Sequence, residues 1–380
     1  MISDFGMRIS NCKRRIKREH ELRSDFGDRA KFLSKKSSDQ FPSHFSIDLK
    51  SALRNLKSAI VAGAMLFAFC SLAGAQQKTI LPRIGYLQAP PPSAVAARTE
   101  AFQQGLRELG YVEGKNIVIE RRFAEGKPER VPALAAELVH LNVDVIVTGG
   151  SLLTRAAKEA TVTIPIVMAQ DIDPVSNGFV ASLARPGGNV TGLSTLAPEI
   201  SGKRLELLKE IFPKLSRVAV LGTSTQPGNR QQLRETELAA RAFGVKLQYL
   251  DVLSPKDIEP AFRESSKGRA EAVVMMVAGA VAAAHRAQIL ELAVKSRLPT
   301  MYPQNTYVEA GGLMSYGVNF ADLDRCAAIY VDKILKGTKP ADLPVEQPKK
   351  FELIINLKAA KQIGLTIPPN VLVRADRVIK

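Results

Sequence analysis

The sequence predicts an α/β protein with two similar lobes, each a parallel sheet flanked by helices. Two observations support this class. From Arg83 onward, short runs rich in β-branched residues alternate with amphipathic helical patterns, which is typical of parallel sheets covered by helices. The order strand, helix, strand, helix, strand, helix and proline-led strand then occurs twice. This repeat is one of architecture and not of sequence, and it indicates two lobes.

The first set of elements occupies the stretch from residue 84 to residue 168. Gly110 ends its first helix, and Ser151 is expected to cap its third. We expect strands at 84–87, 116–121, 143–147 and 165–168, and helices at 94–109, 131–141 and 151–160.

The second set begins after residue 195. Leu205, Leu208 and Phe212 share one face of an expected helix. We expect strands at 217–221, 246–250, 272–277 and 299–302, and helices at 231–243, 258–264 and 281–296. The chain then closes with strands at 312–318 and 351–355, a helix at 323–335 and a short helix at 359–363. Prolines interrupt the tail after Thr366.

Residues 58–75 (SAIVAGAMLFAFCSLAGA) carry no charged side chain and follow a basic stretch. Their apolar core is shorter than the roughly 20 residues that span a bilayer, and Ala73 and Ala75 suit a signal peptidase. The segment therefore predicts a cleaved signal peptide, a mature protein that starts near Gln76, and a periplasmic location. The alternative interpretation is an uncleaved membrane anchor.

Residues 1–57 carry 14 Lys and Arg against 7 Asp and Glu. Their basic clusters would suit nucleic acid, or the segment is a disordered extension that results from a start codon placed too far upstream. The rest of the chain keeps a net charge of +9 out of the total +16, with both signs well mixed. That distribution favours a solvated surface over a nucleic-acid-binding stripe.

Three cysteines occur, Cys12, Cys70 and Cys326, and only Cys326 remains after cleavage. No intramolecular disulfide is then possible. Cys70 admits a lipoprotein interpretation, but Phe69 before it is bulky where such a site needs a small residue.

Catalytic motifs are missing from the sequence. It contains no G-x-S-x-G, no H-E-x-x-H, no Walker loop and no G-x-G-x-x-G after a strand. The two histidines after residue 75, His140 and His285, lie in helical patterns away from cysteines and paired carboxylates. We therefore expect a protein that is not an enzyme and that holds no cofactor and no metal.

Loops after the strands concentrate the residues suited to a ligand. In open parallel sheets, ligands bind at the carboxyl ends of the strands, where helix N-termini present free N–H groups. Glycines there allow close backbone approach, and Asp171 or Asp173 would accept a hydrogen bond from a ligand ammonium. The alternatives are a simple turn for the glycines and Asp173, and core packing for Tyr316. The expected ligand-binding residues are Gln88, Gly149, Gly150, Ser151, Gln170, Asp171, Asp173, Thr223, Ser224, Thr225, Gln226, Ala278, Gly279, Tyr302, Gln304 and Tyr316.

Several runs resemble one family. They are Asp173-Pro174-Val175, the stretch 183–192 (LARPGGNVTG), the stretch 105–111 (GLRELGY), the stretch 113–116 (EGKN) and the stretch 355–360 (INLKAA). Together they extend over essentially all of residues 82–379. The chain is similar to ABC-transporter substrate-binding proteins, among them the tryptophan/tyrosine-type binding proteins. The run 192–196 (GLSTL) lacks an acid that aromatic amino-acid binders of this kind often have there, so the class of ligand stays open.

This resemblance implies a type I periplasmic-binding-protein fold, a clamshell of two Rossmann-like lobes. Lobe I is then expected at 79–196 plus 314–345 and lobe II at 197–313 plus 346–380, with crossing segments near 195–198, 316–319 and 343–348. The implied function is that of a monomeric extracytoplasmic receptor. It would deliver an amino acid or another small polar or aromatic solute to an ABC permease. The alternatives are a membrane-tethered sensing domain or a regulator with the same core; a hydrolase is opposed by the missing nucleophile motif.

Overall fold

The computed structural model describes residues 81–276 and 279–380, and Pro82–Lys380 belong to one compact unit. The expected extension 1–57 and signal peptide 58–75 lie outside the described residues. None of the helices in the described part combines the length and the apolarity needed to cross a membrane.

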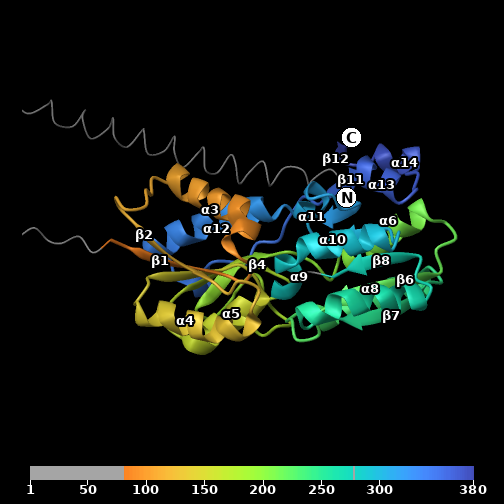
Figure 1. The fold of residues 1–380 in the computed structure, drawn as a ribbon. Helices are drawn as coiled ribbons and strands as arrows, with labels where there is room; N and C mark the ends of the chain where they lie inside the picture. The colour runs from red at the N-terminus through yellow and green to blue at the C-terminus, as the bar shows by residue number, and fades with distance from the viewer. Residues whose placement is uncertain (1–80, 277–278) are drawn as a thin grey trace, which may run out of the picture. The chain divides into compact units, whose positions relative to one another are not determined.

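The first sheet has five parallel strands in the order β2-β1-β3-β4-β5 (Figure 1). Its strands are β1 (Arg83–Gln88), β2 (Val118–Phe123), β3 (Val145–Thr148), β4 (Ile166–Asp171) and β5 (Val190–Ser194). The helical segments between them are η1 (Pro92–Val95), α3 (Ala96–Glu108), η2 (Pro128–Arg130), α4 (Val131–His140) and α5 (Ser151–Ala160).

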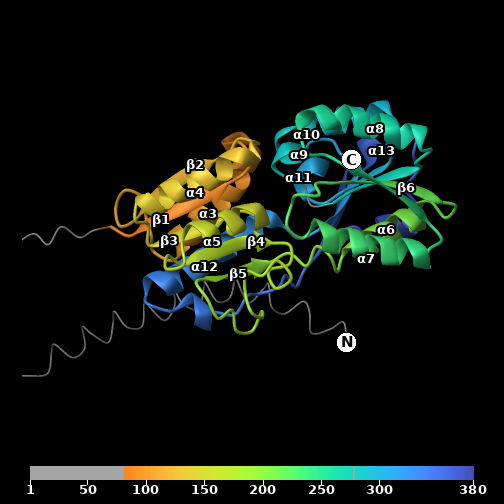
Figure 2. The same cartoon turned by 90° about the horizontal axis from the view of Figure 1, so that it is seen from below.

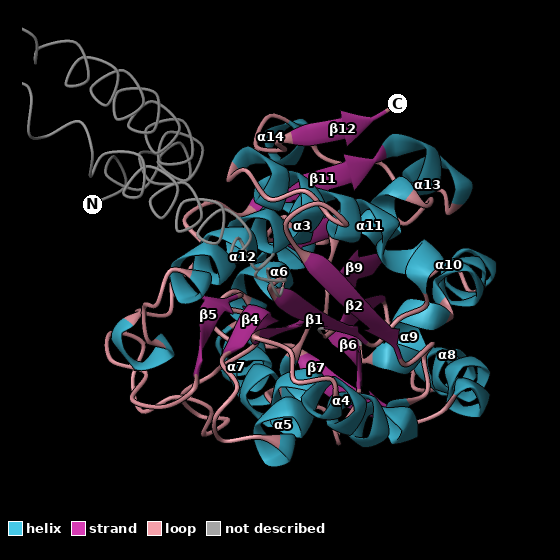
Figure 3. Ribbon diagram, turned by 90° about the vertical axis from the view of Figure 1, so that its left-hand side faces the viewer, coloured by secondary structure: helices cyan, strands magenta, loops and turns pink. Residues whose placement is uncertain are grey.

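The second sheet has seven strands in the order β12-β11-β10-β9-β8-β6-β7 (Figure 3). They are β6 (Arg217–Gly222), β7 (Lys246–Asp251), β8 (Ala272–Met275), β9 (Thr300–Tyr302), β10 (Met314–Gly317), β11 (Glu352–Asn356) and β12 (Arg377–Ile379). Its helical segments are α6 (Ser201–Ile211), α7 (Asn229–Ala242), η3 (Pro255–Asp257), α8 (Ile258–Lys267), α9 (Ala280–Ala284), α10 (Arg286–Lys295) and α11 (Asn305–Glu309). The closing segments are α12 (Phe320–Leu335), η4 (Pro340–Asp342), α13 (Leu357–Gln362) and α14 (Pro369–Leu372).

The predicted architectural repeat is present in the strand order. The order β2-β1-β3-β4-β5 of the first sheet matches β7-β6-β8-β9-β10 of the second, strand for strand along the chain. One contact departs from the expected parallel pairing, because β11 runs antiparallel to β10. The chain reaches β11 only after α12 and η4, and therefore enters the sheet from the opposite end. β12, which we did not predict, pairs parallel to β11.

Each sheet is buried on both faces, as its near-continuous apolar strands require. In the first sheet, Tyr86 and Val147 pack against α3 and α12 on one face, while Leu87 and Ile146 pack against α4 and α5 on the other (Figure 2). In the second, α6 lies over one face and α8 and α10 over the other. Neither lobe therefore needs a further chain to cover its core.

Three segments of the chain connect the two sheets. The first, 195–200, leads from β5 to α6; the second, 318–319, leads from β10 to α12; and the third, 343–351, leads from η4 to β11. The stretch Met314–Gly317, which we expected to open the second part of lobe I, pairs with β9 and β11 in the second sheet. The second crossing thus comes at 318–319, because β10 is the counterpart of β5 in the repeat.

Some helix boundaries also differ from the predicted ones. The expected helix 281–296 is interrupted at His285, which separates α9 from α10. Ser151 is the first residue of α5 rather than its cap: Gly150 takes the capping position, and no side chain caps this end. The Ser151 hydroxyl oxygen instead accepts a hydrogen bond from the backbone N–H of Ile172 at 3.2 Å.

Gly192 in β5 is a position where only glycine fits. Its φ is +130°, and a Cβ there would lie 2.2 Å from the backbone oxygen of Met168 in β4. We expect Gly192→Ala to lower the free energy of unfolding by about 2–3 kcal/mol, because a strained backbone and an immovable neighbour act together. Gly188→Ala is the matched control, since no atom lies within 4 Å of the place where its Cβ would be. Urea denaturation measures both, and equal stabilities for the two variants would contradict the argument.

Candidate functional site

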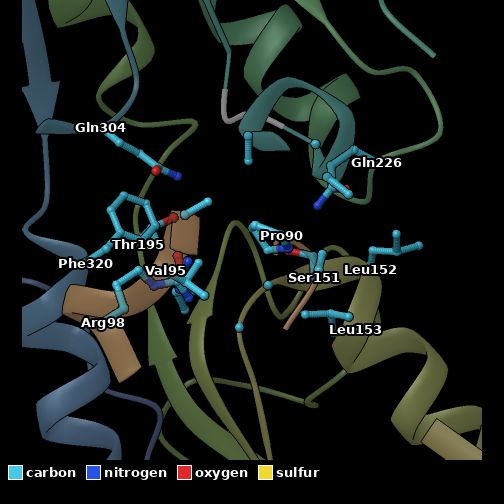
Figure 4. A pocket seen from close by; sticks show the side chains of 18 of the residues that line it. Pro90, Val95, Arg98, Ser151, Leu152, Leu153, Thr195, Gln226, Gln304 and Phe320 are labelled. Carbon is cyan, nitrogen blue, oxygen red and sulfur yellow. The ribbon is translucent and has the colours of Figure 1, made fainter. Parts of the chain in front are cut away.

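A cavity of about 750 Å³, open to solvent on one side, lies where loops from both sheets meet. Residues after β1, β3, β4 and β5 line it from the first sheet, and residues after β6, β8 and β9 line it from the second. Figure 4 shows Ser151, Pro90 and Arg98 on one side, with Gln226 and Gln304 opposite. The carboxyl ends of the two sheets therefore face one space, as in other open α/β folds.

Half of the sequence-predicted residues line this cavity. They are Gly149, Gly150, Ser151, Gln170, Asp171, Gln226, Gly279 and Gln304. Gly150 has a φ of +146°, and nothing lies within 4 Å of the point that a Cβ would occupy. The backbone after β3 is therefore open to a ligand at this point.

The other predicted residues of the first sheet lie away from the cavity surface. Gln88 is fully buried and accepts a hydrogen bond from Arg98 at 3.0 Å. Asp173 forms a turn, because its carboxylate accepts from the backbone N–H of Ser176. The turn alternative therefore describes Asp173 in this structure.

In the second sheet, hydrogen bonds and packing hold the other predicted residues elsewhere. The Thr223 hydroxyl donates to the backbone oxygen of Val252, and Ser224 binds Asp251. The remaining residues are Thr225, which is exposed; Tyr302, which stacks on Tyr307 in the core; Tyr316, which packs against Phe351; and Ala278, which lies outside the described residues.

A buried ion pair forms the floor of the cavity. Arg98 of α3 donates to Asp324 of α12 at 2.9 Å, and the exposed fractions of the two side chains are 8% and 0%. Tyr86 donates to the other carboxylate oxygen at 3.1 Å. Burial raises the pKa of Asp324, and the adjacent guanidinium limits that rise. Because the pair is neutral as a whole, it adds no net charge to the cavity.

Asp171, at the end of β4, is the buried acid of the cavity. It is 1% exposed, and burial raises the pKa of its carboxyl from 3.8 to about 7. Its Oδ1 accepts hydrogen bonds from the backbone N–H of Asp173 at 3.1 Å and from Asn177 at 3.2 Å. Its Oδ2 is buried and has no hydrogen-bond partner. A buried acceptor without a partner is costly, and such groups concentrate at functional sites.

Arg286, the first residue of α10, is the second arginine of the cavity. Its guanidinium donates to the backbone oxygen of Ala94 at 3.1 Å and lies 5.5 Å from the centre of the Tyr307 ring. Its Nε is buried and has no hydrogen-bond partner. No ion pair among the described residues involves Arg286, so its positive charge, unlike that of Arg98, is not offset by a carboxylate.

Apolar side chains complete the lining. They are Val95, Leu152, Leu153, Ile172 and Phe320, and five alanines and prolines lie between them. The Arg98 guanidinium lies 5.9 Å from the centre of the Phe320 ring. A ligand that combines charged groups with an apolar part would match such a lining. Among residues 81–276 and 279–380, no group of three His, Cys, Asp or Glu side chains is placed to hold a metal ion.

Sequence reasoning missed Arg98, Arg286 and Phe320. A signal for the arginines was present, because both lie in the first turn of their helices. A cation there opposes the positive end of the helix dipole, which disfavours a purely structural role.

Comparisons with known proteins agree with this architecture. A Vibrio cholerae conserved domain protein of known crystal structure is 31% identical; the match covers 78% of this chain and 99% of that one, with a TM-score of 0.74. A Streptococcus pneumoniae ABC domain crystallised with L-Trp is 28% identical over 79% of this chain and 100% of that one, with the same TM-score. A tyrosine-binding protein of Clostridioides difficile is 24% identical over 74% of this chain and 81% of its own length.

These likenesses confirm the predicted fold class, in which helices flank the parallel sheets of a periplasmic-binding-protein fold. They also agree with the expectation of a binding protein rather than an enzyme. Residues 91–379 match the family described as ABC transporter substrate binding protein, which is more than half of the chain. The chain therefore belongs to the ABC transporter substrate-binding protein family.

Proposed function

We propose that this protein is the extracytoplasmic receptor of an ABC importer and that it captures an amino acid in the cavity between its two sheets. The cavity itself carries the proposal: loops at the carboxyl ends of both sheets line a space of about 750 Å³. That volume lies within the range of about 300–1,000 Å³ typical of small-molecule sites.

The relatives support an amino acid as the ligand. One is named a tyrosine-binding protein, and another was crystallised with L-Trp. The apolar wall around Phe320 and Ile172 suits the side chain of such a ligand, and its polar edge suits the α-groups. We further propose that the protein is exported as a monomer, loses segment 58–75 and delivers its ligand to a membrane permease. The two lobes and their three crossings are part of this proposal, because hinged lobes allow the ligand to enter and leave.

Calorimetry with the twenty proteinogenic amino acids tests the function. We expect at least one to bind with a dissociation constant of about 1 μM or lower, and an aromatic or large aliphatic one to bind tightest. Ala283→Phe, which places a ring in the cavity lining, should weaken that binding at least about tenfold through steric conflict.

Ala287→Phe is the matched control, because Ala287 is exposed on α10 and does not line the cavity. Its affinity should equal that of the unmodified protein. Absence of binding by all twenty amino acids would contradict the proposed ligand class. Unchanged binding in folded Ala283→Phe would place the site elsewhere.

A further inference from the structure

Two buried atoms without hydrogen-bond partners line the cavity, and they carry opposite charges. One is Oδ2 of Asp171, at the end of β4 in the first sheet. The other is Nε of Arg286, on α10 over the second sheet. Buried polar atoms without a partner are rare in folded proteins, so two of them at one cavity are unusual. Such atoms indicate where a ligand supplies the missing partners.

Charge accounting leads to the same pair. Arg98 is neutralised by Asp324 at 2.9 Å, so this arginine has little attraction left for a ligand anion. Asp171 and Arg286 take part in none of the ion pairs formed by the described residues. The cavity thus offers one unpaired carboxylate and one unpaired guanidinium, which together require a ligand with one cation and one anion.

The partners that each group already has limit what it can still bind. The hydrogen bonds of Asp171 reach its Oδ1, which leaves Oδ2 free to accept from an ammonium. The Arg286 guanidinium donates through one terminal nitrogen to Ala94 and keeps its Nε available. A guanidinium binds a carboxylate through two parallel hydrogen bonds, for which Nε is a suitable donor.

We propose that Asp171 receives the α-ammonium and Arg286 the α-carboxylate of the same amino acid, so that the two charged groups of the ligand join the two sheets. The proposal rests on the proposed function and deepens it, because it restricts the ligands to amino acids with both α-groups free. The ligand side chain then extends along the apolar wall around Phe320. A compound that lacks either charge leaves one buried charge without a partner and is excluded by that cost.

This arrangement also explains how binding would close the lobes. A ligand shifts a conformational equilibrium only through its different affinities for the two states. A zwitterion attached to Asp171 alone gains nothing from closure, whereas one that also reaches Arg286 gains its second ion pair only when the lobes approach. Amino acids with both charges should therefore close the protein, and derivatives with one charge should not.

The test compares the amino acid that binds tightest among the twenty with its α-carboxamide and its Nα-acetyl derivative. Each derivative removes one charge and keeps the side chain. We expect each to bind the unmodified protein at least about thirtyfold more weakly than the parent amino acid. Small-angle scattering at saturation should show a smaller radius of gyration with the parent and no decrease with either derivative.

Two variants assign the charges to residues. Arg286→Gln should weaken the parent amino acid at least about thirtyfold and leave the carboxamide unaffected, because the lost charge no longer has a counterpart. Asp171→Asn should do the same for the Nα-acetyl derivative. The matched controls are Lys295→Gln at the far end of α10 and Glu137→Gln on α4, both outside the cavity.

The outcomes separate this inference from the proposed function. If no amino acid binds, the proposed function fails and this inference fails with it. If an amino acid binds and both derivatives bind equally well, the proposed function stands and the charge assignment is overturned. Sensitivity of the parent and the carboxamide to Arg286→Gln by the same factor would likewise overturn the role of Arg286.

Discussion

Asp324→Asn should lower the free energy of unfolding by about 3–5 kcal/mol. The substitution leaves Arg98 buried without a counter-charge, and removal of one partner from a buried pair costs about that much. The amide also loses one of the two acceptor sites that Arg98 and Tyr86 use. Chemical denaturation at pH 8 measures the change.

An exposed pair provides the matched control for Asp324→Asn. Lys267 and Glu264 are i, i+3 neighbours on α8, with exposed fractions of 75% and 41%. Glu264→Gln should change stability by less than about 1 kcal/mol, because solvent screens such a pair. A loss of less than about 1 kcal/mol in Asp324→Asn as well would show that the buried pair contributes little.

Asp171→Asn should have the opposite effect and stabilise the free protein at pH 8, by as much as about 4 kcal/mol. The carboxyl has a pKa of 3.8 when exposed and about 7 when folded, so the folded state holds an additional proton between these values. Stability therefore falls as pH rises from about 4 to about 7 and stays level above, and each pKa unit corresponds to about 1.4 kcal/mol. The neighbours Ser151, Asn177 and Asp173 supply no positive charge to offset this.

Denaturation curves at pH 4 and pH 8 check this prediction. The stabilisation by Asp171→Asn should be near zero at pH 4 and largest at pH 8. Equal effects at both pH values would mean that the carboxyl titrates normally in the folded protein. A stabilising loss of a cavity residue is what a site that favours its ligand over its own stability predicts.

Ligand affinity should follow the same carboxyl in the reverse sense. An α-ammonium binds the ionised form, which is about a tenth of the free protein at pH 6 and most of it at pH 8. The dissociation constant of the tightest-binding amino acid should therefore be about tenfold higher at pH 6 than at pH 8. In Asp171→Asn the remaining binding should not depend on pH over this range.

The sequence predicted the fold better than the site. Strand and helix periods are local, so the two-lobed repeat could be recognised before any contact was known. The position of the site followed from one general rule, that ligands bind at the carboxyl ends of parallel strands. That rule correctly placed Gly150, Ser151, Asp171 and Gln226 on the cavity lining.

The errors concern the direction of side chains, which depends on distant partners. Tyr302 ends a strand as expected, but its ring points into the core toward Tyr307. Ser224 follows a strand as expected, but Asp251 from the neighbouring strand binds it. The direction of β11 depends on where the chain crosses back, which no local pattern encodes. Arg286 was passed over because arginines in helices are usually solvated.

The position of α12 in the chain has a consequence for synthesis. This helix covers one face of the first sheet, but it follows ten strands and reaches its last residue only at Leu335. The apolar side of Tyr86 and Val147 therefore stays uncovered until nearly nine-tenths of the chain has left the ribosome. Contacts at such sequence separations form slowly. The nascent protein should thus remain incompletely folded for most of its synthesis, the condition in which a polypeptide can still be threaded through a translocation pore.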